Sequence, residues 1–302
     1  MTARRRVLWR VVLFVLVLAS VLFGWRTRSE AHKLVTNPRE TRKTVSDTPA
    51  ARGLAFDDVA VTTTDGLHLK GWFIPGTVPA TVMIVHGYKD SRSMMLGVAA
   101  ILHAHGFNVV VPSLRGHDDN DGEQISFGLR ESADLDAFYR YAVARPDVDR
   151  RRFGLFGVSM GGTISIGYTA QNPEIRALVS DCAFSSIRDT VETSVRFFTG
   201  LPPFPFAPAI LFWTEREIHG DVDDVDAKKW IRAIAPRPVL LMQGGADKVV
   251  SPASGSKLFE AAAEPKELWF EPSVGHAEFL KMQPQEFEAR LTKFFDRYLV
   301  AR

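Results

Sequence analysis

The sequence predicts an α/β fold built on a mostly parallel central sheet. Short β-rich runs alternate with helical stretches from about residue 54 onward. The strand-like runs are nearly all apolar, as strands are when helices cover both faces of a sheet. The first two of these runs flank Asp65-Gly66, a pair typical of the tight turn in an antiparallel hairpin. We therefore expect a parallel sheet with an N-terminal antiparallel hairpin and helices on both faces.

The composition fits a globular protein with one large core. The chain has 302 residues, of which 46% are apolar and 24% are charged. Its single cysteine, Cys182, excludes an intrachain disulfide and a cysteine-rich metal centre. The net charge is +2, but residues 1–53 carry eleven Lys and Arg against three acidic residues, so the rest of the chain is net negative. We therefore expect no nucleic-acid partner.

The N-terminus contains an apolar run at residues 7–25, interrupted by Arg10 and Ser20. A helix of this length reaches roughly 28 Å, close to the ~30 Å thickness of the hydrocarbon core of a bilayer. We expect residues 1–25 to form a membrane anchor, with its arginine-rich start in the cytoplasm and the bulk of the chain extracytoplasmic. A secretory signal has the same pattern, so a secreted protein is the alternative, although no A-x-A-like cleavage site follows the run.

Residues 26–53 are polar and charged, which predicts a tether, and residues 54–302 then form the folded domain. The alternation of patterns predicts its elements in order. We expect strands at 56–63, 67–74, 80–86, 107–112, 152–158, 176–181, 238–243 and 267–271, and helices at 91–105, 129–144, 161–171, 253–263 and 284–299. The first two strands form the hairpin.

A long interruption at about 185–233 predicts a small inserted cap, because plain connections are much shorter. It contains two helix-like pieces and six aromatic residues that either line an apolar pocket or attach the cap to the domain. These residues are Phe197, Phe198, Phe204, Phe206, Phe212 and Trp213.

Ser159 lies in the pentad Gly157-Val158-Ser159-Met160-Gly161, between an apolar strand and a helix. This is the context of a nucleophile elbow, in which a sharp turn exposes the serine hydroxyl and glycines allow close backbone packing. A serine needs a base and a group that orients the base. Asp247 and His276 follow the last two predicted strands, at 238–243 and 267–271, which places them at the same sheet edge as Ser159. Asp181, at the end of another strand, is the rival acid.

These residues make the chain resemble the α/β-hydrolase superfamily. The resemblance rests on His86-Gly87-Tyr88, Arg115-Gly116-His117, the elbow at 157–162, the Gly244–Asp247 segment and Gly275-His276. The chain looks most like membrane-anchored serine hydrolases akin to prolyl-oligopeptidase-like and monoglyceride-lipase-like members. The resemblance implies an α/β-hydrolase fold and an oxyanion hole formed by the backbone N–H groups of Met160 and Tyr88.

We therefore predict a serine hydrolase that cleaves a carboxylic ester or related acyl bond, with Ser159, Asp247 and His276 as catalytic triad. The expected substrate is a small acyl or ester compound, and a lipid-like ester is one hypothesis. We expect neither a cofactor nor a metal. The loop at 117–122 has acidic residues before a glycine but no glutamate at position 128 for a calcium site, so we expect a solvated loop.

Two alternatives remain. An aminopeptidase or oligopeptidase shares the triad and reserves acidic residues for the substrate's amino group, and the cap offers Glu215, Glu217, Asp221, Asp223 and Asp224. A hydrolase fold used only for binding is the second alternative, and it usually lacks a triad member. The sequence does not indicate the oligomeric state.

Overall fold

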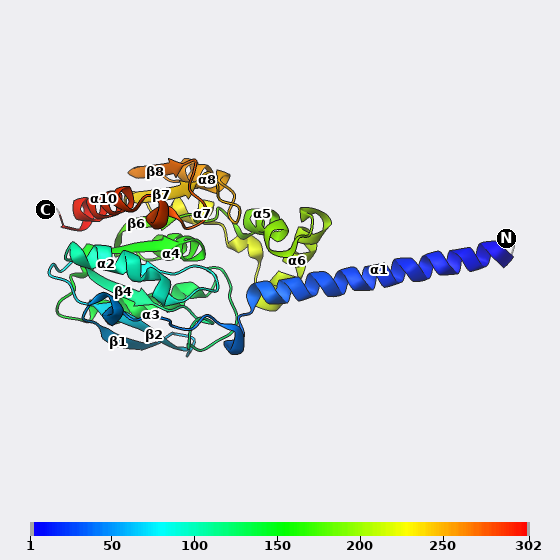
Figure 1. Cartoon of the computed structure of the whole chain (residues 1–302), viewed down its shortest axis with the longest axis horizontal. Coiled ribbons are helices and arrows are strands. Elements are labelled where there is room, and N and C mark those ends of the chain that lie inside the picture. The colour runs from blue at the N-terminus through cyan, green and yellow to red at the C-terminus, as the bar shows by residue number, and fades with distance from the viewer. Residues whose placement is uncertain (1–2, 301–302) are drawn as a thin grey trace.

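The eight strands form one sheet in the order β1-β2-β4-β3-β5-β6-β7-β8 (Figure 1). This computed structural model describes residues 3–300. From β4 onward neighbouring strands are parallel, whereas β1–β2 and β2–β4 are antiparallel. The predicted fold class is confirmed. The strands are β1 Asp57–Thr62, β2 His68–Ile74, β3 Thr81–Val85, β4 Asn108–Pro112, β5 Phe153–Val158, β6 Ile175–Asp181, β7 Val239–Gly244 and β8 Lys266–Glu271.

The N-terminal hairpin turns where the Asp65-Gly66 pair predicted. Thr62 of β1 pairs with His68 of β2. Gly66 has φ +87°, a left-handed conformation that residues with a side chain rarely adopt. The glycine therefore closes the turn and fixes the register of the two strands.

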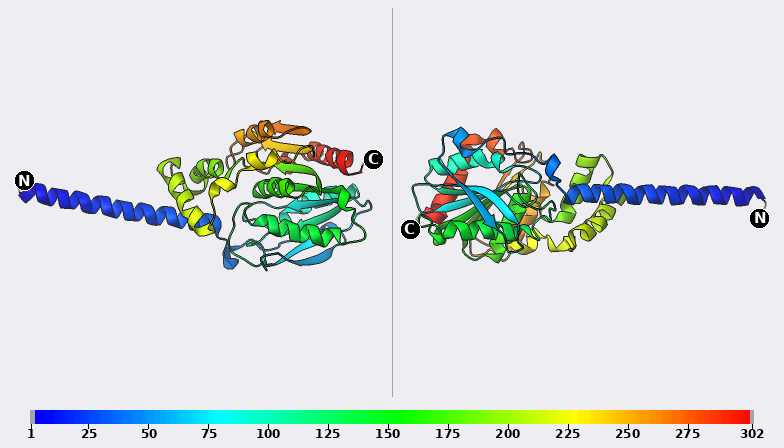
Figure 2. Two further views of the ribbon diagram at one scale, coloured as in Figure 1. Left: turned by 180° about the vertical axis from the view of Figure 1, so that it is seen from behind. Right: turned by 90° about the horizontal axis from the view of Figure 1, so that it is seen from below.

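Helices cover both faces of the sheet and bury two hydrophobic clusters (Figure 2). One cluster includes side chains of α3 (Glu131–Val143), α4 (Met160–Gln171), α7 (Ala227–Ile231) and α8 (Ala253–Ala261). The other includes side chains of α2 (Leu96–Ala104), α9 (Phe279–Met282) and α10 (Pro284–Phe295).

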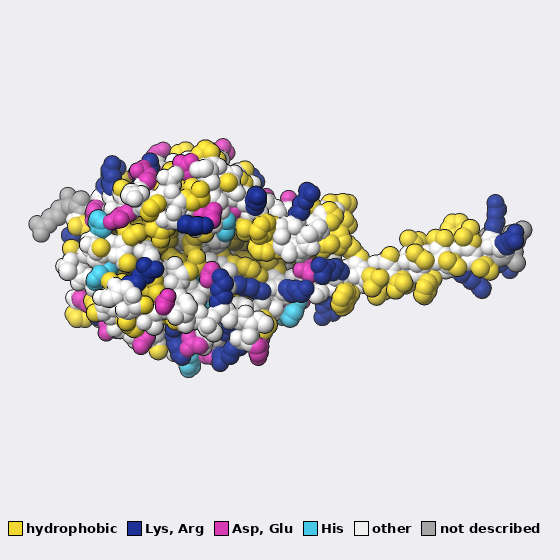
Figure 3. Space-filling model, viewed as in Figure 1, with side chains coloured by type: hydrophobic (Ala, Val, Ile, Leu, Met, Phe, Trp, Pro, Cys, Tyr) yellow, Lys and Arg dark blue, Asp and Glu magenta, His cyan; other side chains and the backbone are white. Residues whose placement is uncertain are grey.

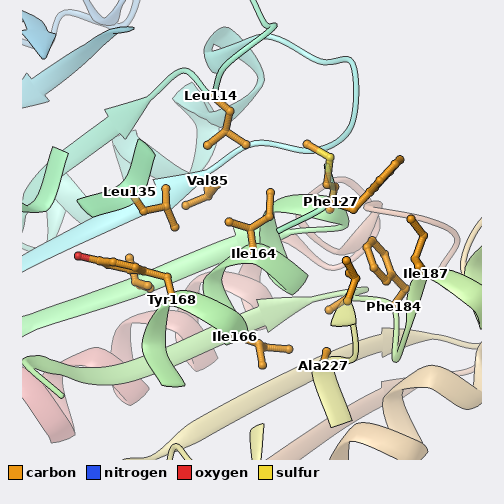
Figure 4. Close-up of a cluster of buried hydrophobic side chains, with 14 of the residues drawn as sticks. Val85, Leu114, Phe127, Leu135, Ile164, Ile166, Tyr168, Phe184, Ile187 and Ala227 are labelled. Carbon is orange, nitrogen blue, oxygen red and sulfur yellow. The ribbon is translucent and has the colours of Figure 1, made fainter. Parts of the chain in front are cut away.

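The cluster beneath α4 supports the strand that leads to Ser159. In Figure 4 the side chains of Val85 in β3, Leu135 in α3 and Ile164 in α4 gather beside the sheet. All three are fully buried. Complete burial of an aliphatic side chain stabilises a fold by about 1.5–3 kcal/mol, so this contact fixes α4 firmly against the central strands.

Helices α5 (Ile187–Thr199) and α6 (Pro203–Ile218) form a bent pair within the segment that the sequence assigned to a cap. Their axes differ by 111° across the short break between them. Figure 1 shows the pair beyond the carboxyl ends of the strands, between the sheet and the projecting N-terminal helix.

Helix α1 (Ala3–Val35) projects from the body of the molecule and contains the whole apolar run at 7–25. Its most apolar window of 18 residues has a mean hydropathy of 2.5 and is not buried within the protein. It is long and apolar enough to cross a membrane, as an anchor or a signal segment would be.

Residues 26–35, the first ten of the expected tether, are helical in the structure, because α1 continues to Val35. An ion pair between Arg26 and Glu30 joins successive turns at 2.9 Å. Ala31 and Val35 are fully buried in the first hydrophobic cluster. Tertiary packing thus holds a helix that local composition did not indicate.

Candidate active site

Ser159 occupies a strained turn between β5 and α4. Its backbone has φ +55° and ψ −121°, which is rare for a residue with a side chain and is typical of functional sites. A Cβ atom added to Gly161 would lie 2.4 Å from the carbonyl oxygens of Val85 and His86. Glycine is therefore required where α4 starts against β3, and this close approach fixes the serine at the sheet edge.

His276 brings the three predicted catalytic residues together. It lies after β8, and its Nε2 is 2.9 Å from Ser159 Oγ. Its Nδ1 is 2.7 Å from Asp247 Oδ2, in the loop after β7. Because an ionised carboxylate only accepts hydrogen bonds, Nδ1 carries the proton and Nε2 is free to accept the serine's proton.

The Asp247 carboxylate is buried and fully hydrogen-bonded. Its side chain has no exposed surface. Oδ1 accepts the backbone N–H groups of Val249 and Val250 at 2.8 and 2.9 Å, and Oδ2 accepts from His276. A buried charge needs such partners, and these three donors also fix the carboxylate in the plane required by the imidazole.

The rival acid, Asp181, is close to the site but differently placed. Its backbone carbonyl accepts the N–H of Ser159 at 2.8 Å. Its side chain is buried, and Oδ1 has no partner among the described residues. Burial raises the pKa of the Asp181 carboxyl to about 7, and the charge of Asp247 adds to the effect. Asp247 is therefore the acid that holds the histidine.

Cys182, next to Asp181, lies close behind the histidine. Its Sγ falls within 4.8 Å of ligand atoms of Asp247 and His276, so these three residues could be read as metal ligands. However, burial and the neighbouring carboxylates raise the pKa of the Cys182 thiol well above its usual value. A protonated thiol is a poor metal ligand, and His276 and Asp247 are already engaged in the hydrogen bonds to Ser159 and to each other.

Two buried histidines hold the His-Gly loop beside Ser159. His86 Nδ1 donates to Gly87 O at 2.9 Å, and its Nε2 accepts the N–H of Leu114. His117 Nδ1 donates to Arg115 O, and its Nε2 accepts the N–H of Lys89 at 3.1 Å. Burial lowers the pKa of both imidazoles, so each remains neutral with one accepting nitrogen.

The loop at 117–122 is consequently not the solvated loop that the sequence led us to expect. His117, Asp118 and Asn120 are all buried. The side chain of Asn120 donates to Ser113 O at 2.6 Å, and Asp118 accepts from Ser113 Oγ at 2.6 Å. This loop positions its neighbours, and the sequence feature that indicates such a role is Arg115-Gly116-His117. Polar side chains that directly follow a buried strand can hydrogen-bond to the neighbouring loops.

The candidate oxyanion donors, Met160 and Tyr88, belong to two loops that meet at Ser159. Within residues 3–300 neither backbone N–H has a hydrogen-bond acceptor. The Cβ position of Gly87, next to Tyr88, lies 3.6 Å from Ser159 Cβ. Free N–H groups beside a nucleophile are what a developing oxyanion requires. Their role remains a prediction.

The Tyr88 side chain contacts the N-terminal helix. Its hydroxyl donates to Leu34 O at 2.8 Å, and Lys89 Nζ donates to Lys33 O at 2.6 Å. These carbonyls belong to the last turn of α1, where helical partners are missing. The side chains of the His-Gly loop thus cap the helix that carries the apolar run, a contact that sequence analysis missed because no local pattern indicates it.

Removing this contact by Tyr88→Phe should lower the free energy of unfolding of the full chain by about 1 kcal/mol, because a neutral hydrogen bond is lost and a carbonyl is left uncapped. Chemical denaturation in detergent measures the change. Tyr141→Phe is a matched control, since its hydroxyl meets only the partly exposed Arg145 at 3.2 Å. An effect of Tyr88→Phe no larger than that of the control would contradict the contact.

Two of the six cap aromatics contact the N-terminal helix. Phe206 packs on Phe23 of α1 with ring centroids 5.1 Å apart, and the Arg28 guanidinium lies 5.6 Å from the Trp213 ring centroid. The other four are exposed, namely Phe197, Phe198, Phe204 and Phe212. The sequence left two roles open for these aromatics, lining a pocket or attaching the cap. Phe206 and Trp213 attach the cap to α1.

A mostly parallel sheet with a serine on a strand-to-helix turn, hydrogen-bonded to a histidine after the last strand, defines an α/β-hydrolase. The comparisons bear this out. The chain belongs to the α/β-hydrolase superfamily, and the family model described as "Serine aminopeptidase, S33" matches residues 76–213. It is therefore a hydrolase enzyme.

Relatives extend over most of the chain. The uncharacterized protein Rv2307c of Mycobacterium tuberculosis is 31% identical over 274 residues, covering 88% of this chain and 87% of that protein. Protein bem46 of Schizosaccharomyces pombe is 26% identical, covering 74% and 70%. The Pyrococcus furiosus esterase Pf2001 matches with a TM-score of 0.75 at 25% identity, covering 88% of this chain and 98% of the esterase.

Proposed function

We propose that this protein is a membrane-anchored serine esterase that works through an acyl-enzyme. The observation that carries the proposal is the continuous hydrogen-bond chain from Ser159 Oγ through His276 to Asp247, with separations of 2.9 and 2.7 Å. Similarity to an esterase of known structure supports the ester as the bond that is cleaved.

The proposed reaction begins when Ser159 Oγ attacks the ester carbonyl and His276 Nε2 takes its proton. Negative charge then develops on the carbonyl oxygen, and the N–H groups of Met160 and Tyr88 stabilise it by roughly 3 kcal/mol each. His276 delivers its proton to the leaving alcohol, which leaves an acyl group on Ser159. Water activated by His276 hydrolyses this acyl-enzyme, and Asp247 stabilises the imidazolium in both halves of the reaction.

The membrane part of the proposal rests on α1. Its apolar run is exposed from Val7 to Leu22, which a helix in water would not sustain. Three arginines precede the run, so we propose that the N-terminus is cytoplasmic and the hydrolase domain extracytoplasmic. A secreted form produced by signal cleavage is the alternative. Edman sequencing or intact mass of the protein from membranes distinguishes the two.

A peptidase is the second candidate, because the family description names a serine aminopeptidase. Binding of an α-amino group would need free acidic side chains near the substrate. Of the cap acids, Glu217 binds His32 at 2.9 Å and Asp223 binds Arg188 at 2.9 Å, and both contacts lie on the surface. These two ion pairs leave fewer free acidic side chains in the cap for an amino group, which supports the ester over the peptide.

A panel of p-nitrophenyl esters of graded chain length, assayed beside aminoacyl p-nitroanilides, tests the choice. We expect the best ester to exceed the best anilide at least tenfold in kcat/KM, roughly the effect of 1.4 kcal/mol in transition-state binding. A preference for the anilides would establish the peptidase instead. Turnover of neither class, together with no labelling by a fluorophosphonate, would favour a hydrolase fold that only binds.

A further inference from the structure

The turn between α5 and α6 is an exposed apolar surface outside α1. Residues 197–214 contain no charged side chain. Phe197, Phe198 and Phe204 are 54, 61 and 80% exposed. Figure 3 shows hydrophobic side chains over this end of the cap, beside the projecting helix. Exposed aromatic clusters of this kind mark an interaction surface, because the contact of apolar side chains with water is unfavourable.

Contacts between α1 and α6 fix the level of this turn along the anchor helix. Phe23 meets Phe206, Arg28 meets Trp213, and His32 meets Glu217. The residue numbers rise together along both helices, so α1 and α6 run in the same direction. Phe206 is therefore level with Phe23 of α1. The chain bends at Phe204, whose backbone angles are non-helical (φ −98°, ψ 134°), so the regular spacing of the two helices ends there.

The level of Phe23 lies inside the apolar run of α1, which ends at Trp25. At ~1.5 Å per helical residue, Phe206, level with Phe23, is roughly 3 Å deeper than the end of the run, and the turn precedes Phe206 along the direction of α6. Segments that lie in a membrane interface bury their apolar face to a depth of about 5–10 Å. The turn, which lies on the N-terminal side of Phe206, therefore extends toward the depth of an interfacial segment whenever α1 spans a bilayer.

The charged residues of both helices lie on the other side of the same boundary. Beyond Arg10, the next charged residue of α1 is Arg26, and on α6 the first charged residue is Glu215. Trp213, level with Arg28, lies between the apolar and charged parts, the position that tryptophan prefers at a membrane surface. Two helices far apart in sequence thus change from apolar to charged over nearly the same depth.

We propose that the α5–α6 turn inserts into the lipid leaflet through which α1 emerges, so that the cap and the anchor contact one membrane surface together. Phe197, Phe198 and Phe204 enter the boundary between headgroups and acyl chains. The carboxyl edge of the sheet, with Ser159, then faces the membrane through the cap, and substrate reaches the site from the leaflet. This inference rests on the membrane anchor of the proposed function.

Depth-dependent quenching tests the insertion without relying on enzyme activity. The full chain, with Phe204→Cys labelled by an NBD fluorophore, is reconstituted in phosphatidylcholine vesicles that carry a nitroxide on the lipid acyl chain. Cys182 is buried and protonated, so it does not compete for the label. Leu22→Cys in α1 reports on the anchor, and Phe270→Cys, at a 44%-exposed phenylalanine of β8, reports on the solvated body.

We expect the lipid nitroxide to quench the probes at 204 and 22, and aqueous iodide to quench only the probe at 270. Quenching of the probe at 22 alone would overturn the inserted turn and leave the anchor intact. Quenching of none by the lipid nitroxide would overturn both. A probe at 204 that is shielded from iodide and from the nitroxide, with shielding that increases with protein concentration, would show cap-to-cap contact and also overturn the proposal.

A second readout uses the ester substrate. The triple variant Phe197→Ser, Phe198→Ser, Phe204→Ser is expected to hydrolyse long-chain esters embedded in vesicles roughly tenfold more slowly, because apolar surface no longer holds the cap in the lipid. Hydrolysis of a soluble short-chain ester should be unchanged, as should both activities of the matched variant Phe270→Ser. Equal loss on both substrates would indicate damage to the fold and contradict the proposed role.

Discussion

Ser159→Ala is expected to lower kcat/KM on the preferred ester by at least ~10⁴-fold, because triad residues act as a unit and loss of the nucleophile removes the acyl-enzyme route. The oxyanion donors and substrate binding sustain only the small rate that remains. Labelling by a fluorophosphonate probe should disappear in the same variant. Steady-state assays on p-nitrophenyl esters and gel fluorescence of the labelled protein measure the two effects.

Ser165→Ala is the matched control for this variant. Ser165 lies on the same helix, and its buried hydroxyl has no hydrogen-bond partner among residues 3–300. Its removal should leave both turnover and labelling close to the wild-type values. A Ser159→Ala protein that remains folded and retains more than about a hundredth of the activity would show that another group is the nucleophile.

The sequence alone indicated the elements that position this serine. Strand β5 is apolar throughout, and glycines at 157 and 161 precede and follow the serine, so local composition predicted the strand, the turn and α4. Asp247 and His276 could be predicted to lie near Ser159 because parallel strands end at one edge of a sheet. The predicted triad was based on this shared edge of the sheet. In the structure, hydrogen bonds join His276 to Ser159 and to Asp247 there.

Long-range packing was not predictable in the same way. The helix from residue 26 to Val35 depends on contact with α6, which lies more than 180 residues later, and its own sequence contains few apolar residues. The capping of its last turn by Tyr88 and Lys89 likewise joins segments that share no local pattern. Composition favoured a tether there because it does not register the tertiary contacts that stabilise a short helical extension.

The choice between the two acids yields the second large effect. Asp247→Asn is expected to lower kcat/KM on esters by about 10⁴-fold, because an amide in place of the carboxylate no longer stabilises the imidazolium and favours the wrong histidine tautomer. The shape of the side chain is nearly unchanged, so the fold should persist. Steady-state kinetics and thermal unfolding of the same preparation separate loss of chemistry from loss of structure.

Asp181→Asn is the matched variant, and we expect a less than tenfold change in kcat/KM, because the structure gives Asp181 no hydrogen bond to His276.

The two variants also differ in the dependence of stability on pH. With a pKa raised from 3.8 to about 7, Asp181 stays protonated in the fold while the unfolded chain ionises, so wild-type stability falls as pH rises through this interval. The Asn variant should lack that decrease. A severe loss of activity with Asp181→Asn and a mild one with Asp247→Asn would reverse the assignment, because the carboxylate that supports the histidine during turnover would then be the one at the end of β6.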